Sequence, residues 1–307
     1  MQLTREAFER ARRFLMHEAR ELERALFRRA FEAAPVEPVL EALAAYRNSD
    51  GGFGRALEPD LRLAASSVLA TCYALELLTR VGRVADTELW NDAIDWLVEA
   101  HAPDLDAWRS VPRDGERHPH APWWAWELHE DGTRWPVGVL PRAEVLDYLW
   151  RSRDRVPAAL VEEQTRRLVE ALESAQTLDA DSLIRCDRLA RSASTPAWAR
   201  RAVAARTRTL GQAAVCRDPA QWQSYVAKPL KLAPEPESVL AEPLAHDVQR
   251  SLDYEIVHQR PDGSWRPYWS WGDHYPDVWT QARSEWSGVL TLDMLLSLRA
   301  YDRLEPL

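Results

Sequence analysis

Two carboxylic acids lie close together in the stretch "GRALEPDLRLAASS". Glu58 and Asp60 are separated by a single proline and stand shortly before an apolar, helix-forming segment. Two carboxyl groups this close can share a proton, which raises the pKa of one of them and suits it to act as an acid near neutral pH. The competing interpretation is an ion pair with Arg55 or Arg62, which would favour the ionised carboxylates.

Tryptophan is concentrated in two parts of the chain, because ten of the fifteen tryptophans lie at 108–135 or 265–286. The faces of aromatic rings stabilise cations and give flat surfaces on which sugars or apolar ligands stack. The alternative is that these rings plug gaps between helices. The rings that we expect to line a cavity are Trp126, Trp269 and Trp271. The rings that we expect to plug gaps are Trp124 and Trp265.

Polar side chains follow these rings. Glu127 and His129 come directly after Trp126, and His274 lies in "WGDHY"; we predict that all three face the incoming ligand. The histidines of "RHPHAP" are separated by proline and have no carboxylate at helical spacing, which favours a solvated loop over a metal site. The three cysteines are widely spaced, without a C-x-x-C pair. We therefore predict no metal and no cofactor.

The bulk composition excludes several classes of protein. The chain has 307 residues, 46% of them hydrophobic, which is enough for a well-formed core. Its formal net charge of −9 argues against a general affinity for nucleic acid or anionic membrane. The N-terminus is charged throughout, and no stretch approaches the roughly 18 apolar residues of a membrane span. We expect a cytoplasmic protein with a single domain at 1–307, and the sequence does not indicate its oligomeric state.

Helical spacing of apolar residues dominates the chain, and almost no segment alternates with period two. Helices are predicted over the first thirty residues and at 37–47, 65–81, 86–101, 141–152, 157–176, 180–192, 196–214, 238–258 and 284–301. The fold class that this predicts is all-α. The segments at 66–78 and 287–298 are apolar on nearly every face, so we place them in an inner layer. The charged faces of the N-terminal helix and of the helices at 86–101 and 157–176 favour an outer layer.

An internal repeat precedes each of the two apolar helices. "YRNSDGGF" (46–53) aligns with "HQRPDGSW" (258–265), and 129–135 is a degenerate third copy. In each copy an Asp can accept bonds from the backbone two residues on, a Gly tolerates positive φ, and an aromatic residue can insert between helices. These residues are Asp50, Gly51 and Phe53 in the first copy and Asp262, Gly263 and Trp265 in the second.

These two stretches resemble the Q-x-x-D-G-[GS]-[FW] repeats of the terpenoid cyclase and protein prenyltransferase superfamily. The resemblance implies a single (α/α) toroid, in which inner helices surround a central cavity and outer helices wrap them. It also implies that the repeat clamps helices and that the chemistry lies elsewhere.

Two branches of that superfamily can be compared with this chain. The zinc ligands of protein prenyltransferases, an Asp, a Cys and a His, have no counterpart in the sequence. Class II terpene cyclases protonate an alkene with the middle Asp of D-x-D-D. The nearest stretch is "LDADSLIRC", in which Asp179 and Asp181 match but Ser182 replaces the last Asp. The resemblance makes Asp181 the acid, whereas helix capping is the competing role for Asp179.

Three functions follow from these observations. The first is acid-initiated cyclisation or isomerisation of an isoprenoid in an aromatic-lined cavity, which makes an apolar small molecule the expected ligand. The second is a non-catalytic toroid that binds a lipid or a partner protein. The third is a carbohydrate-active enzyme, since six-hairpin glycosidases share the architecture and use pairs of acids beside tryptophans. Its carboxylates would be Glu58, Asp60 and Glu127.

Overall fold

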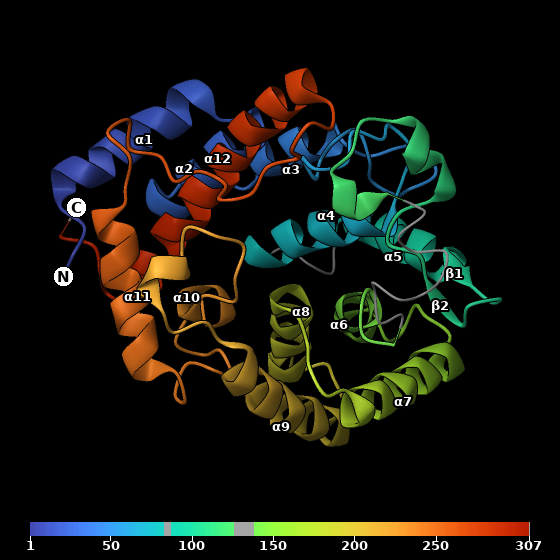
Figure 1. Ribbon diagram of the computed structural model, residues 1–307. Helices are drawn as coiled ribbons and strands as arrows, with labels where there is room; N and C mark the ends of the chain where they lie inside the picture. The colour runs from blue at the N-terminus through green and yellow to red at the C-terminus, as the bar shows by residue number, and fades with distance from the viewer. Residues whose placement is uncertain (83–86, 126–137, 307) are drawn as a thin grey trace.

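The computed structural model describes residues 1–82, 87–125 and 138–306, and this part of the chain is mostly α-helical (Figure 1). The helices are α1 Arg5–Glu18, α2 Glu21–Phe31, α3 Glu37–Ala44, α4 Val68–Arg80, α5 Glu88–Glu99, α6 Arg142–Arg151, α7 Ala158–Ser174, α8 Ala180–Arg191, α9 Ala197–Ala214, α10 Pro229–Leu232, α11 Ala245–Val257 and α12 Pro276–Ala300. A two-residue strand β1 (His101–Ala102) pairs antiparallel with β2 (Ala107–Trp108). The predicted all-α class is confirmed.

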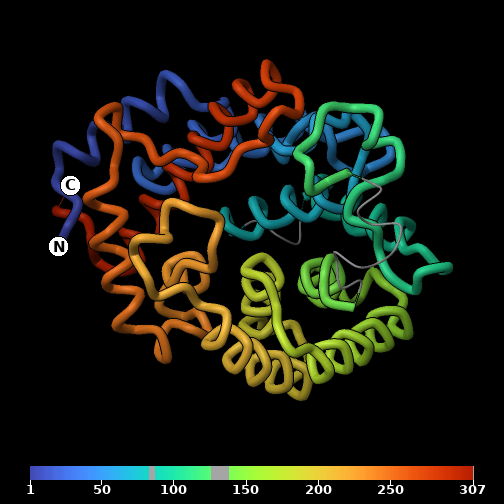
Figure 2. Tube along the Cα trace, viewed as in Figure 1, coloured from blue at the N-terminus to red at the C-terminus, as the bar shows by residue number. Residues whose placement is uncertain are grey.

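The helices follow one another around the molecule, so that the first and last parts of the chain meet (Figure 2). The Leu3 N–H donates to the carbonyl of Arg303 at 2.7 Å, and the Glu305 N–H donates back to the carbonyl of Leu3 at 3.0 Å. Helix α1 also packs against α12. These contacts join residues about as far apart as the sequence allows.

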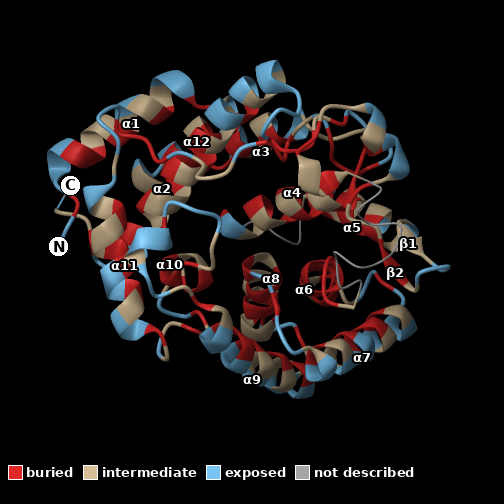
Figure 3. Ribbon diagram, viewed as in Figure 1, coloured by how far each residue is buried: buried red, intermediate tan, exposed pale blue. Residues whose placement is uncertain are grey.

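Helices near the middle of the molecule alternate with peripheral ones (Figure 1). Helix α6 packs on α4 and α8, and α8 packs on α10, while α7 and α9 lie outside them. Every residue from Arg142 to Trp150 is buried, as expected for a helix that is covered on all sides. The outward faces of α7 and α9 are exposed (Figure 3). The side chains that meet in the middle therefore come from α4, α6, α8 and α10.

The first thirty residues form two helices, and the single long helix predicted there is wrong. Ala19 and Arg20 adopt extended backbone angles between α1 and α2. The break is stabilised by the Arg20 side chain, which pairs with buried Glu23 at 2.6 Å and donates to the carbonyl of Leu57 at 2.9 Å. No Pro or Gly marks the break, and the apolar spacing continues through it. Two further boundaries differ from prediction, because α11 begins at Ala245 and α12 at Pro276.

The first Asp-Gly turn joins α4 to an outer helix. Gly51 has φ +90°, and a Cβ there would lie 2.9 Å from the backbone oxygen of Asp92 in α5. Asp50 accepts a hydrogen bond from the N–H of Gly52 at 3.1 Å. Phe53 is fully buried, and its N–H donates to the Thr71 hydroxyl of α4 at 3.0 Å.

The second turn repeats this geometry against α1. Gly263 has φ +92°, and a Cβ there would lie 2.3 Å from the backbone of Arg10. Asp262 accepts from the N–H of Ser264 at 3.0 Å. The N–H of buried Trp265 donates to Thr291 of α12 at 3.0 Å, the same distance as in the first copy. The two copies are therefore one structural device that fixes an outer helix to the inner helix that follows.

Within the described ranges, no helix is both long and apolar enough to cross a membrane.

Candidate active site

Asp60 lies in the loop between Phe53 and α4. Its carbonyl accepts a hydrogen bond from the N–H of Ala121 at 2.8 Å, and Leu61 forms an isolated bridge with His120. A small apolar cluster, separate from the main core, underlies this loop and contains Leu61, Leu63, Val111, Ala121, Trp124, Trp271 and Ala282. Trp124 thus fills a gap, which is the role that the sequence predicts for it. The backbone at Asp60 and Leu61 is therefore held by the segment that contains His120 and Ala121.

The carboxyl group of Asp60 is buried among tryptophans. The indole N–H of Trp271 donates to Asp60 Oδ1 at 2.8 Å. Burial raises the pKa of Asp60 to about 6, and the indoles of Trp271, Trp286 and Trp269 act weakly in the opposite direction. The indole nitrogens of Trp269 and Trp286 are themselves buried, and no described residue lies at normal hydrogen-bond length from them. Asp60 is therefore a buried acid whose pKa is raised toward neutral pH, with the indole N–H of Trp271 as its donor and the charge of Arg62 acting against the shift.

Glu58 is buried next to Asp60. Desolvation and the neighbouring carboxylate of Asp60 raise the pKa of Glu58 well above its usual range, and its Oε2 has no hydrogen-bond partner among the described residues. The alternative ion pairs are not formed, because Arg62 pairs with Glu285 at 2.5 Å and Arg55 donates to Asn48 at 3.1 Å. The geometry favours a pair of carboxyl groups that hold a proton.

Four aromatic rings contact one another next to Asp60. We call these rings, Tyr225, Tyr268, Trp269 and Trp286, the aromatic cluster. The ring centroids of Trp269 lie 5.3 Å from those of Trp286 and Tyr268 and 6.0 Å from that of Tyr225. Their edge-to-face contacts stabilise such a group of rings. Tyr225 is 57% exposed, and the other three rings are partly exposed. The cluster thus offers aromatic surface to a ligand.

Asp181 lies at the other end of the aromatic cluster. It accepts a hydrogen bond from the Tyr225 hydroxyl at 2.5 Å and pairs with Lys231 at 3.2 Å. Burial alone would raise the pKa of Asp181, but the charges of Lys231 and Arg185 and the Tyr225 hydrogen bond outweigh it and lower that pKa. Asp181 is therefore held as a carboxylate, which is the opposite of what a proton donor requires.

The two lysines of the chain contact the aromatic cluster, and the sequence analysis did not predict this. Lys228 and Lys231 are the only lysines in the sequence. The Lys228 ammonium lies 4.0 Å from the ring centroid of Tyr268, and the Lys231 ammonium lies 4.4 Å from that of Tyr225. Lys228 is also buried against Glu255 at 2.9 Å. The signal that could have marked them is that two lysines lie three positions apart in a chain that otherwise uses arginine.

Asp179 caps helix α8. Its carboxylate accepts from the backbone N–H of Ser182 at 2.7 Å and from the Ser182 hydroxyl at 3.2 Å. The geometry is that of an N-cap, so the capping role weighed for Asp179 is the one that its contacts support. The Ser that replaces the last Asp of D-x-D-D takes part in the same cap.

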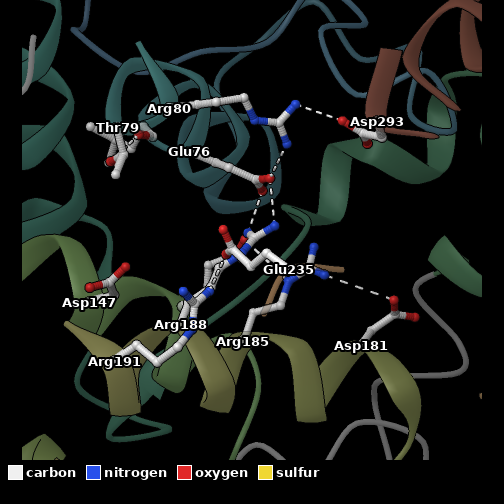
Figure 4. A network of polar contacts seen from close by, with 12 residues as sticks. Glu76, Thr79, Arg80, Asp147, Asp181, Arg185, Arg188, Arg191, Glu235 and Asp293 are labelled. Carbon is white, nitrogen blue, oxygen red and sulfur yellow. Dashed lines mark hydrogen bonds and ion pairs between the residues drawn. The ribbon is translucent and has the colours of Figure 1, made fainter. Parts of the chain in front are cut away.

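A network of ion pairs links the inner helices (Figure 4). Arg80 of α4 pairs with Asp293 of α12 at 2.6 Å and with Glu76 at 3.0 Å. Arg188 of α8 donates two hydrogen bonds to the carboxylate of Glu76, one of them at 2.5 Å. Burial opposes ionisation of Glu76, but Arg188 and Arg80 lower its pKa to about 2. The middle of the molecule is charged here, and helical spacing alone did not reveal it.

Arg185 connects this network to Asp181. It pairs with Glu144 of α6 at 3.4 Å and approaches Asp181 at 3.9 Å. Burial raises the pKa of Glu144, and Arg185 only partly offsets this. Helix α8 thus supplies Arg188 to Glu76 of α4 and Arg185 to Glu144 of α6.

The remaining predicted residues are placed as follows. Trp271 is fully buried and its indole N–H donates to Asp60, so it supports the carboxyl group; this differs from the predicted role of Trp271 in lining an open cavity. Trp265 is buried and donates to the Glu255 carbonyl at 2.9 Å, which agrees with the plugging role. His274 is exposed. Trp126, Glu127, His129 and the third repeat copy lie outside the described residues.

The histidine pair of "RHPHAP" does not assemble a metal site. His120 is buried, and its Nδ1 lies 2.6 Å from the carbonyl of His118. Within the ranges that the structure covers, no group of three or more His, Cys, Asp or Glu side chains is arranged to hold a metal ion.

No protein-family model matches the chain, and the search of curated proteins finds no match either.

Proposed function

We propose that the chain is an (α/α) toroid that carries out acid-initiated chemistry on an uncharged isoprenoid held against the aromatic cluster. One observation carries this proposal: two carboxyl groups, with pKa values shifted in opposite directions, lie at opposite ends of one aromatic surface. Groups separated in this way are suited to act as acid and base in one reaction. Asp60 is the acid, and Asp181 is the carboxylate.

The pKa of Asp60 favours a particular kind of protonation. A general acid works best when its pKa is near the working pH, and a value of about 6 meets that condition. An unactivated alkene needs a much stronger acid, whereas the oxygen of an epoxide is easier to protonate. An epoxide of an isoprenoid is therefore the substrate that this acid suits.

The proposed reaction conserves atoms and charge. Asp60 gives its proton to the epoxide oxygen, the C–O bond breaks, and a hydroxyl group and a carbocation form. An alkene of the same substrate adds to the cation, while the faces of Trp269, Trp286 and Tyr225 stabilise it. Loss of a carbon-bound proton to Asp181 restores an alkene. Water then returns both carboxyl groups to their starting states.

Glycoside hydrolysis is a second candidate, supported by a separate observation. Asp60 has the raised pKa of a glycosidase acid, and the nearby Trp269 and Trp286 are partly exposed rings on which a sugar can stack. In that reaction Asp60 would protonate the leaving oxygen of the glycosidic bond, and water would add to the sugar carbon and give up a proton that restores the carboxyl group. The same residue acts, but the substrate differs.

The test uses Asp60→Asn, with Asp273→Asn as an exposed control on the segment that carries Trp271. Wild type and both variants are incubated with an epoxide of farnesol and with an aryl glycoside, and products are measured by mass spectrometry. The proposal expects cyclised alcohol from the epoxide, a loss of at least about 100-fold in Asp60→Asn, and no change in Asp273→Asn. Release of the aryl alcohol alone would instead identify a glycosidase. Equal turnover by wild type and Asp60→Asn would refute both.

A further inference from the structure

A cavity lies near the C-terminal ends of three helices. It has a volume of about 540 Å³, within the range of small-molecule sites. It is lined by residues from the C-terminal halves of α2 and α12, by Arg80 at the end of α4, and by Ala33 and Val81, which follow α2 and α4. None of the residues of the acid site or of the aromatic cluster lines this cavity.

Most of the cavity wall is apolar. Leu26 and Phe31 of α2 face Leu292 and Leu296 of α12, and Val81 follows α4. Apolar walls of this kind bind the hydrocarbon part of a ligand, because burying it removes apolar surface from water.

Three arginines, Arg29, Arg80 and Arg299, complete the lining, and no carboxylate belongs to it among the described residues. Arg80 is already neutralised by Glu76 and Asp293. Arg29 and Arg299 have no ion pair within the described part of the chain. Each donates only to a backbone carbonyl, Arg29 to Ala34 at 3.1 Å and Arg299 to Ala30.

The guanidinium of Arg299 packs on an aromatic ring, although Arg299 as a residue is exposed. Its carbon lies 4.5 Å from the ring centroid of Phe31, and burial lowers its pKa with no carboxylate to offset the effect. A guanidinium carries five N–H donors, so most of those on Arg29 and Arg299 are free to bind a ligand. Each of the three helix ends contributes about half a negative charge. The positive charge of the two unpaired guanidinium groups is larger than the sum of these three contributions.

We propose that this cavity binds an anionic amphiphile, a molecule with one hydrocarbon chain and a carboxylate or phosphate head. The chain lies against Leu26, Leu292 and Leu296, and the head pairs with Arg29 and Arg299. The site is independent of the proposed chemistry at Asp60.

Calorimetric titration of the whole protein tests this with three probes below their micelle concentrations: decanoate, decyl phosphate and decanol. The proposal expects one saturable site for at least one anion and at least tenfold weaker binding of decanol. Decanoate alone would indicate a fatty-acid head, and decyl phosphate alone a phosphate head. Decanol bound as tightly as the anions, or no saturable binding of any probe, would overturn the proposal.

Matched variants locate the site. Arg29→Gln and Arg299→Gln each remove one charge-assisted contact and are expected to weaken anion binding about tenfold. Arg28→Gln, an exposed neighbour outside the cavity, is expected to bind as wild type does. Arg299→Lys keeps the charge and retains part of the affinity, and thermal unfolding shows that each variant is folded. Equal losses in Arg28→Gln and Arg299→Gln would show that the binding is not at this cavity.

Discussion

Asp60→Asn is expected to make the protein more stable at neutral pH and to have little stabilising effect in acid. Asp60 is 3% exposed, and its pKa is raised from 3.8 to about 6. The folded protein therefore binds the proton more tightly than the unfolded chain does. Stability falls as the pH rises from about 4 through about 6, because the unfolded chain ionises first.

The size of the effect follows from the shift. Each pKa unit corresponds to about 1.4 kcal/mol, so a shift of about 2 units makes the ionised form cost about 3 kcal/mol of unfolding free energy above pH 6. Asn is neutral at every pH and can still accept the Trp271 N–H. Any packing cost of the substitution is the same in acid and at neutral pH, so the difference between the two conditions reports the charge of Asp60 together with its effect on the neighbouring Glu58.

Urea unfolding of wild type, Asp60→Asn and the exposed control Asp273→Asn at about pH 4 and about pH 7.5 measures this. The advantage of Asp60→Asn over wild type should grow by about 2 kcal/mol between the two conditions, since part of the shift is already felt at pH 4. The control should show no such change. If the stability difference between Asp60→Asn and wild type is the same at both pH values, Asp60 has no raised pKa, and the acid role assigned to it loses its basis.

Three further predictions concern the fold. Gly263→Ala should destabilise the protein by several kcal/mol, since positive φ and a backbone clash both oppose it, whereas Gly272→Ala, which has positive φ but open space, should cost about 1 kcal/mol by urea unfolding. Glu76→Gln should lower the unfolding free energy by about 3 kcal/mol at neutral pH, because the pKa of Glu76 in the folded protein is about 2, below the usual 4.5. Wild type loses this stability as the pH falls toward 2, so thermal scans should show the stability difference between the two proteins closing there. Thr291→Val should cost about 1–3 kcal/mol, because it leaves the buried N–H of Trp265 unpaired, and a larger increase in amide exchange elsewhere than at Trp265 would contradict this.

The sequence predicted local features that rest on short stretches. The Asp-Gly turns, the helix at 142–151 and the cap formed by Asp179 depend on neighbouring residues, and the structure contains all of them. The break at Ala19–Arg20 was not predictable, since it depends on contacts between Arg20 and a loop more than thirty residues away.

The site shows the same division. Glu58 and Asp60 could be chosen from their spacing, but Asp60 is buried only because the fold covers its loop, and its hydrogen-bond donor Trp271 lies more than 200 residues away. Asp181 was chosen from a motif, and its lowered pKa depends on Lys231 and Tyr225, which only folding brings to it. Residue types indicate which groups can titrate, whereas tertiary contacts decide the direction of the shift.

The meeting of Leu3 with Arg303 and Glu305 has a consequence for how the protein is made. During synthesis α1 leaves the ribosome well before α12 and the turn at Gly263, against which it packs. Phe8 can pack early on Phe27 and Phe31 of α2, but the contacts of α1 with α12 cannot form until α12 has been made. This delay leaves part of the apolar face of α1 open to aggregation while the intervening helices are made.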